Sequence, residues 1–157
     1  LKGREVVVGV SGGIAAYKVA DVVSKLVQLG AGVTVCMTAE EQKFVTPLTF
    51  SSLTGRPVYG DMFAPISSAG EEHVHLARQA DIVIIAPATA TTMARLAHGL
   101  ADDMVALTVL ATTAPVLLAP AMDAQMWAAA ATQDGESEHG EQEPENGLQE
   151  SGHKFLH

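Results

Sequence analysis

Short apolar runs alternate along this chain with longer segments in which apolar residues recur every three or four positions. The runs over 5–10, 32–37, 82–86 and 116–119 are rich in valine, isoleucine and leucine, as buried strands are. After the first run, Val19, Val22, Val23 and Leu26 are spaced as one apolar face of a helix over about 14–29, which Gly30 ends. The alternation predicts a parallel α/β sheet covered by helices on both faces, in three layers.

Proline, glycine and aspartate mark the bounds of the remaining elements. Pro47 is expected to begin a helix that Gly55 ends. Pro87 is expected to break the third strand, and Asp102 to cap the helix that follows Gly99. The other expected elements are an irregular surface loop over 57–72 and helices over about 39–44, 90–97, 103–112 and 124–131.

The first strand ends at Ser11-Gly12-Gly13, and a helical pattern follows at once. Backbone N–H groups in such a turn lie at the positive end of the helix dipole, which favours an anion such as a phosphate. The turn is not a Walker loop, since no Gly-Lys-Ser/Thr follows, and Ala16 stands where the dinucleotide fingerprint needs its third glycine. By itself the turn fits a ligand-free connection equally well.

The four segments that follow the predicted strands share one chemical character. Ser11-Gly12-Gly13, Thr38, 87–92 and 120–123 are small, hydroxylated or rich in glycine and proline, with no charge before Asp123. Ligands of parallel sheets bind beyond the carboxyl ends of the strands. An uncharged edge suits a planar ring system with one phosphate better than a triphosphate with a metal, and so predicts a ligand like flavin mononucleotide (FMN).

The net charge of −9 is concentrated in one segment. Seven of the 18 acidic residues fall between 134 and 150, where there is no Lys or Arg, so the rest of the chain is nearly neutral and carries no basic stripe for nucleic acid. We therefore expect one domain over 1–133, an acidic, flexible loop over 134–145 and a C-terminal segment of the same domain over 146–157.

Cysteine content and hydropathy bear on location. The single cysteine, Cys36, excludes an internal disulfide framework, fits a reducing compartment and is expected to be a small buried hydrophobe. The polar residues 1–4 lead directly into a strand, so no signal peptide is expected. Residues 104–122 are uncharged, but Pro115 and Pro120 favour a helix, a turn and a strand over a membrane span. These features predict a cytoplasmic protein without a membrane segment.

Four segments in order resemble one known family. They are VGVSGGIAAYK over 8–18, His73 eight residues before Asp81, APATATT over 86–92 running on to GLADD over 99–103, and PAMDAQMW over 120–127. Each is weak by itself, but together they are specific, and the match extends from Glu5 to about Gln133. On these residues the chain resembles the homo-oligomeric flavin-containing cysteine decarboxylases.

The resemblance implies a flavodoxin-like or Rossmann-like subunit that forms a homotrimer or a multiple of trimers, such as a homododecamer, with FMN at the subunit interface. His73 matches the active-site histidine, while Asp123 and Met126 match substrate-binding positions. The positions expected to hold FMN are Ser11, Gly12, Gly13, Ile14, Thr38, Thr89, Ala90, Thr92, Ala121 and Met122.

The resemblance also implies a reaction, the FMN-dependent decarboxylation of 4′-phosphopantothenoyl-cysteine to 4′-phosphopantetheine in coenzyme A biosynthesis. In this family the flavin oxidises the cysteine moiety, carbon dioxide leaves and the reduced flavin returns the electrons. No metal is expected, because the flavin itself accepts and returns the electrons. Without the other motifs, His73 would be read as a surface histidine, sharing one face with His75 if the segment is extended.

Two departures from the family pattern matter. Asp123 stands where the family usually has an asparagine whose amide recognises the substrate carboxylate, and a carboxylate there repels that group. The family's reductive step uses a cysteine on a mobile clamp C-terminal to these motifs, and Cys36 matches no such position.

Three alternatives therefore stay open. The first is a peptidyl-cysteine decarboxylase of the same fold, which needs no clamp cysteine. The second is a prenyl-transferring flavoprotein, disfavoured because little Arg or Lys lies near the strand ends. The third is a non-catalytic flavin-binding regulatory subunit.

Overall fold

The computed structural model describes residues 1–60 and 72–133, with side chains from Val74 onward in the second range. Its strands are β1 (Glu5–Val10), β2 (Gly32–Met37), β3 (Val58–Tyr59), β4 (Ile82–Ala88) and β5 (Val116–Pro120). Its helices are α1 (Ala16–Gln28), the short 3₁₀ helix η1 (Glu41–Lys43), α2 (Pro47–Thr54), α3 (Glu72–Gln79), α4 (Ala90–Ala97), α5 (Met104–Ala111) and α6 (Ala124–Ala128).

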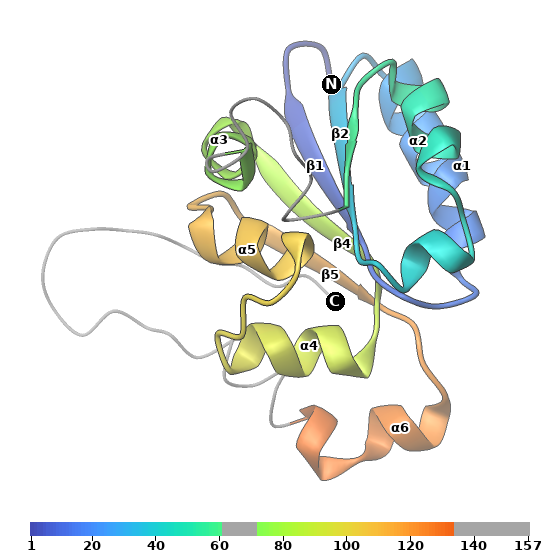
Figure 1. The fold of residues 1–157 in the computed structure, drawn as a ribbon, viewed down its shortest axis with the longest axis vertical. Coiled ribbons are helices and arrows are strands. Elements are labelled where there is room, and N and C mark those ends of the chain that lie inside the picture. The colour runs from blue at the N-terminus through green and yellow to red at the C-terminus, as the bar shows by residue number, and fades with distance from the viewer. Residues whose placement is uncertain (61–71, 134–157) are drawn as a thin grey trace, which may run out of the picture.

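The strands form one parallel sheet in the order β3-β2-β1-β4-β5. Helices α1 and α2 lie on one side of the sheet and α3, α4 and α5 on the other, which gives three layers (Figure 1). The chain moves outward from β1 to β3 and then returns to the other side of β1 as β4. The carboxyl ends of β1 and β4 therefore meet at a topological switch point, where sheets of this kind bind their ligands.

Successive side chains of β1 point to opposite faces of the sheet and so belong to two separate core clusters. Val6, Val8 and Val10 pack with α1, α2 and the matching face of β2, whereas Val7 points into the cluster beneath α5. Both faces of the strand are buried, as the unbroken valine run predicts. The flavodoxin-like or Rossmann-like α/β fold expected from the sequence is confirmed, and the strand order follows the Rossmann arrangement.

Three expectations about the connections are wrong. The segment from 57 onward contributes a short edge strand, β3, because Val58 and Tyr59 pair with Val35 and Cys36 of β2. Strand β4 does not stop before Pro87: an irregularity in register between Ile85 and Ala88 lets the strand pass the proline and resume pairing. The segment 72–79 is the helix α3, so an extended arrangement of the two histidines is wrong.

Helix bounds also differ in detail from the expectation. Helix α1 begins at Ala16, leaving Ile14 in the preceding turn, and Val22 is exposed while Val19 and Val23 are buried. Gly30 follows α1 with φ of +86°, which confirms the expected glycine stop. The cap of α5 is Asp103 and not Asp102, because the Asp103 carboxylate accepts the Ala106 N–H at 2.8 Å.

Several expectations lie outside the described residues. They concern the acidic loop over 134–145, the C-terminal segment over 146–157 and most of the loop over 57–72. In the part of the chain that the structure describes, no helix has both the length and the apolar character needed to cross a lipid bilayer.

Candidate functional site

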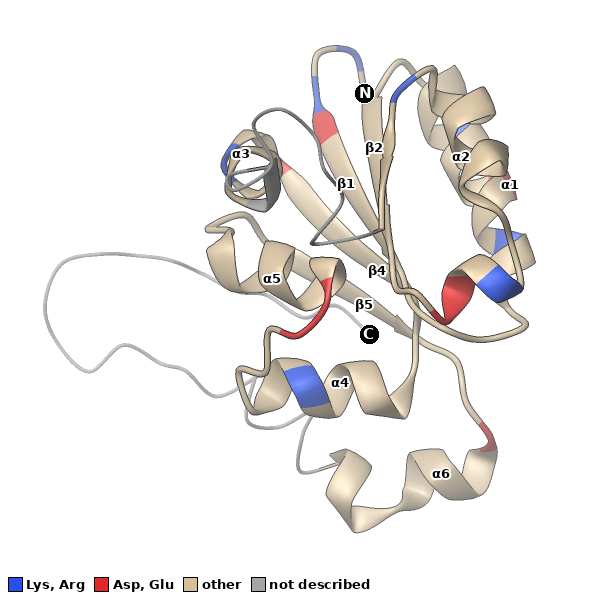
Figure 2. Ribbon diagram, in the orientation of Figure 1, with Lys and Arg blue, Asp and Glu red and all other residues tan. Residues whose placement is uncertain are grey.

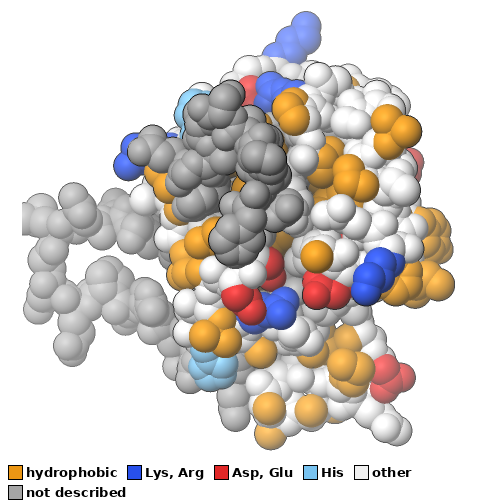
Figure 3. Space-filling view, in the orientation of Figure 1, with side chains coloured by type: hydrophobic (Ala, Val, Ile, Leu, Met, Phe, Trp, Pro, Cys, Tyr) orange, Lys and Arg blue, Asp and Glu red, His pale blue; other side chains and the backbone are white. Residues whose placement is uncertain are grey.

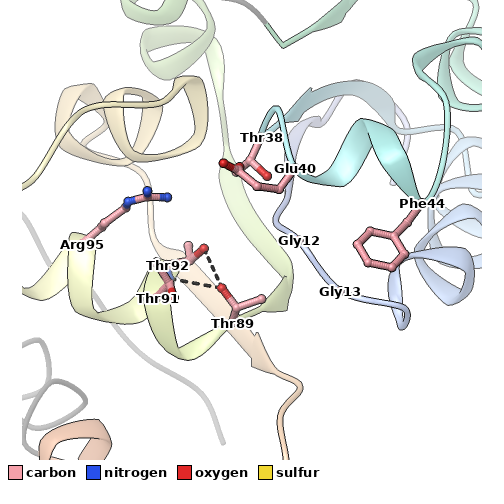
Figure 4. Close-up of a pocket in the computed structure, with 9 residues that line it drawn as sticks. All are labelled: Gly12, Gly13, Thr38, Glu40, Phe44, Thr89, Thr91, Thr92 and Arg95. Atoms are coloured by element: carbon pink, nitrogen blue, oxygen red, sulfur yellow. Dashed lines mark hydrogen bonds between the residues drawn. The ribbon is translucent and has the colours of Figure 1, made fainter.

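A pocket opens at the switch point between β1 and β4, with a volume of about 340 Å³. This volume is at the lower end of the range, roughly 300–1,000 Å³, that small-molecule sites occupy. Figure 4 shows Gly12 and Gly13 on the side of β1, Thr38 and Glu40 after β2, and the α4 side chains opposite. The lining residues are Gly12, Gly13, Thr38, Glu40, Phe44, Thr89, Thr91, Thr92 and Arg95.

Ser11 fastens the two loops of the pocket to each other. Its fully buried hydroxyl donates to the Pro87 carbonyl at 2.5 Å and accepts the Thr89 N–H at 3.2 Å. Both contacts join the end of β1 to the end of β4. Ser11 therefore positions the pocket, and its hydroxyl is already engaged within the protein.

Thr89 begins α4 and orients the hydroxyl groups beside the pocket. Its side chain accepts the Thr92 N–H at 3.2 Å, and the two threonine hydroxyls lie 3.0 Å apart. This is the usual N-cap contact of a threonine. The expected clustering of Gly12, Gly13, Thr38, Thr89 and Thr92 is present in the structure.

The pocket is not uncharged, and that expectation is wrong. Arg95 of α4 lines it and forms ion pairs of 3.2 Å with Asp102 and with Asp103. On the other side, Glu40 lines the pocket from the segment after β2. Figure 2 shows these acidic and basic residues on η1, on α4 and before α5, around the carboxyl end of the sheet. The sequence argument considered only the residues directly after each strand and so omitted the next helical turn.

Glu41 is buried directly behind the glycine turn. Its Oε2 atom accepts the Gly13 N–H at 3.0 Å, and its own N–H contacts the Thr38 hydroxyl at 3.4 Å. Its Oε1 atom is buried without a hydrogen-bond partner among the described residues. Burial raises the pKa of this carboxyl from 4.5 to about 7, and the bond from Gly13 opposes the shift only in part.

The remaining predicted cofactor positions do not line the pocket of this chain. Ile14 is 78% exposed beside Gly13, and Ala90 begins α4 without lining the pocket. Ala121 donates its N–H to the Ala88 carbonyl at 3.1 Å, and Met122 packs against the second core cluster. Trp127 is partly buried and packs against the same cluster.

The two predicted substrate-binding residues lie on α6, away from the lining residues. The carboxylate of Asp123 accepts the Gln125 N–H at 2.8 Å and caps this short helix, while Met126 is 51% exposed. Helix α6 buries none of its residues and projects below the rest of the fold in Figure 1. Within one chain, therefore, these residues are not brought to the pocket.

The structure tests the prediction for Cys36 but not the one for the His73 side chain. The backbone of His73 lies in the first turn of α3, but its side chain is outside the described part of the structure. Cys36 is fully buried in β2, and burial raises the pKa of its thiol to about 12. The expectation of a small buried hydrophobe is confirmed for Cys36.

Four lining residues were missed in the sequence: Glu40, Phe44, Thr91 and Arg95. A signal for Arg95 was available, because it follows Thr92 by three residues and so shares its side of a helix. No local pattern identifies Glu40 and Phe44. They reach the pocket because η1 folds back beside the glycine turn.

Residues 1–136 match the protein-family model described as Flavoprotein. Two relatives carry the description "Coenzyme A biosynthesis bifunctional protein CoaBC". The one from Vibrio cholerae is 46% identical over 134 residues, covering 85% of this chain and 34% of the relative. The one from Escherichia coli is 48% identical over 133 residues, covering 85% and 33%. The chain thus spans about a third of the length of these relatives.

Solved structures agree in fold. The FMN-dependent cysteine decarboxylase SpaF superposes with a TM-score of 0.84 at 30% identity, over 98% of this chain and 83% of SpaF. A PPC decarboxylase mutant complexed with pantothenoylaminoethenethiol gives a TM-score of 0.77 at 25% identity, over 99% and 82% of the two chains. With its family model matched over most of its length, this chain belongs to the flavoprotein family.

Proposed function

We propose that this chain is an FMN-dependent carboxy-lyase that converts 4′-phosphopantothenoyl-cysteine to 4′-phosphopantetheine in coenzyme A biosynthesis. The observation that carries the proposal is the pocket at the β1/β4 switch point, built from the motif residues Gly12, Gly13, Thr89 and Thr92. Identities of 46–48% to the bifunctional relatives, against 30% to SpaF, support the coenzyme A substrate.

The pocket residues fit FMN in their chemistry. Threonine hydroxyls and the half-buried Arg95 offer hydrogen-bond donors, and the glycine turn lets a ligand approach the backbone. When bound, the flavin supplies the electron acceptor for oxidation of the cysteine moiety. We propose that Gly12, Gly13, Thr38, Thr89 and Thr92 hold it, with Ser11 positioning the two loops.

The chain's own side chains would then bind the substrate and move protons. We propose that His73 assists proton transfer at the substrate thiol, since an imidazole can both accept and donate a proton near neutral pH. Asp123 and Met126 are proposed to contact the substrate, and Ile14, Ala90, Ala121 and Met122 to contact the flavin.

Self-association explains why these residues are separated within one chain. Ile14, Tyr17, Phe44 and Leu48 are 58–78% exposed next to the glycine turn and η1. Figure 3 shows hydrophobic side chains on the surface beside these elements. Exposed apolar groups beside a pocket mark a contact surface. We propose that a second copy covers them and completes the site, in a trimer or a multiple of trimers such as a dodecamer.

The first test uses the purified protein. We expect it to be yellow, to release FMN in a 1:1 ratio on denaturation, and to convert phosphopantothenoyl-cysteine to a product lighter by one carbon dioxide. Sedimentation of the yellow species measures the assembly. A protein that takes up no flavin, even when FMN is added, would contradict the proposal.

A second candidate function is peptidyl-cysteine decarboxylation. SpaF, which superposes with a TM-score of 0.84, is described as an FMN-dependent cysteine decarboxylase, so a cysteine substrate other than phosphopantothenoyl-cysteine stays a candidate. Assays with peptides that end in cysteine separate the two candidates, because only this second function predicts their turnover in preference to phosphopantothenoyl-cysteine.

Replacing Asp123 with asparagine is expected to lower KM for the substrate by up to about tenfold. An amide caps α6 as well as a carboxylate does, and it removes a like charge from the substrate carboxyl group. Steady-state kinetics at constant flavin loading measure the effect. Asp123→Ala is the control, because it removes the same charge but also the cap; an unchanged KM in Asp123→Asn would show that Asp123 does not face the substrate carboxylate.

The composition of the chain supports two further proposals, on its domain bounds and on its location. We propose that 1–133 form the flavoprotein domain, with 134–145 as a loop and 146–157 returning to the same domain. The single cysteine and the biosynthetic description of the relatives support a cytoplasmic location.

A further inference from the structure

The glycine turn carries a feature that the proposed flavin site does not explain. The turn is placed to offer its N–H groups to a phosphate, yet the Gly13 N–H is donated to the Glu41 carboxyl at 3.0 Å. Glu41 has no solvent exposure, so this hydrogen bond is shielded from water. An internal acidic group therefore occupies a donor that an anionic ligand would use.

The second oxygen of Glu41 makes the arrangement unusual. Oε1 is buried with no hydrogen-bond partner among the described residues. A buried oxygen without a partner is costly, and more so when it carries charge. A carboxyl to which the described residues donate one backbone N–H is thus a weak occupant that a better-bound anion can replace.

We propose that Glu41 competes with the phosphate of the ligand for the Gly13 N–H, and so sets how tightly this site binds a phosphorylated flavin. This inference rests on the proposed FMN site. When the phosphate takes the amide, the Glu41 carboxyl must give it up, and an ionised carboxyl also repels the phosphate. A neutral carboxyl offers weaker competition and no repulsion.

The surroundings of Glu41 determine the direction of the pH effect. Glu40 and Lys43, the charged residues next to Glu41 in sequence, and Lys18, the charged residue nearest in sequence to Gly13, are exposed, and Arg95 lies across the pocket. The shift of the Glu41 pKa to about 7 comes from burial, opposed by Gly13. Competition should therefore increase as pH rises through about 7.

The test measures binding of FMN, and of riboflavin, which lacks the phosphate, to flavin-free protein by fluorescence quenching from pH 5.5 to 8.5. At pH 8 we expect Glu41→Gln and Glu41→Ala to bind FMN about tenfold more tightly than wild type, with the difference shrinking toward pH 5.5. Riboflavin affinity should be the same in all three proteins. Titration of the FMN phosphate itself cancels in this comparison, because every protein meets the same ligand.

Lys43→Gln is the control, since it removes an exposed charge from η1, the same short helix as Glu41, at a position outside the pocket lining and away from the Gly13 N–H. It should change FMN affinity by less than about threefold, with no midpoint near pH 7. FMN affinities within twofold of wild type in both Glu41 variants, or an equal gain for riboflavin, would overturn the proposal. Wild-type protein that binds no flavin at any pH would instead contradict the proposed FMN site.

Thermal unfolding of the flavin-free protein gives an independent readout. The folded protein holds the Glu41 proton up to about pH 7, whereas the unfolded chain loses it near 4.5. Between these values the folded state binds more protons, so wild type should lose stability relative to Glu41→Gln as pH rises, and should stay lower above pH 7. A constant difference between the two proteins across pH 4.5–8 would show that Glu41 does not titrate in this window, and would overturn the pH dependence.

Discussion

Replacing His73 with asparagine is expected to slow decarboxylation by at least about 100-fold while leaving the flavin bound, because positioned general acid–base groups contribute roughly that much or more. Asparagine can form hydrogen bonds but cannot carry a proton between substrate atoms at neutral pH. The measurement is kcat per bound flavin, with the flavin absorbance spectrum recorded in the same sample. An unchanged spectrum with a lost rate places the defect in the chemical step.

His75 provides the matched control on the same helix. It lies two residues further along α3 and is exposed, so His75→Asn should retain the wild-type rate within about twofold. Full activity in His73→Asn would remove this histidine from the mechanism and would favour the non-catalytic flavin-binding alternative. Equal loss in both variants would point to disruption of α3 in place of a chemical role.

Replacing Gly9 with valine is expected to destabilise the protein by about 3 kcal/mol or more. A Cβ atom at this position would lie 2.6 Å from Ile85 Cδ1 and 2.9 Å from Val105 Cγ1, both in fully buried side chains. The valine adds two more carbons to the same contact. Such a loss is a large part of the 5–15 kcal/mol that typically separates folded from unfolded domains. Denaturant unfolding of the flavin-free protein measures it.

The double variant with Val105→Ala tests whether the clash is the cause. Val105→Ala alone removes two buried methyl groups and should destabilise the protein by about 2 kcal/mol. If valine at position 9 collides with Val105, the double variant will lose at least about 1 kcal/mol less than the sum of the single variants. Strict additivity would mean that the loss has another origin, such as the backbone at the end of β1.

Local sequence patterns were sufficient to predict most of the helices and strands and to identify the family. The valine-rich runs, the helical spacing after Gly13 and the glycine stop at Gly30 are decided by neighbours within a few residues, so they are legible in the sequence. The ligand edge followed from the same patterns, because parallel strands end at one edge of a sheet. The short strand β3 was missed, since two residues carry no periodicity and gain their structure from pairing with β2.

The sequence by itself determined the small-residue, hydroxyl-rich character of the strand ends in a parallel α/β sheet, because strand ends and glycine turns are local features, and it predicted a ligand site at that edge. Only the tertiary structure decided the charge of that edge. Arg95 and Glu40 enter the pocket, and Glu41 is buried against Gly13, through the way α4 and η1 pack beside the turn. Burial raises the Glu41 pKa, and the hydrogen bond from Gly13, 28 positions away, opposes part of that rise; neither effect is visible until the chain is folded.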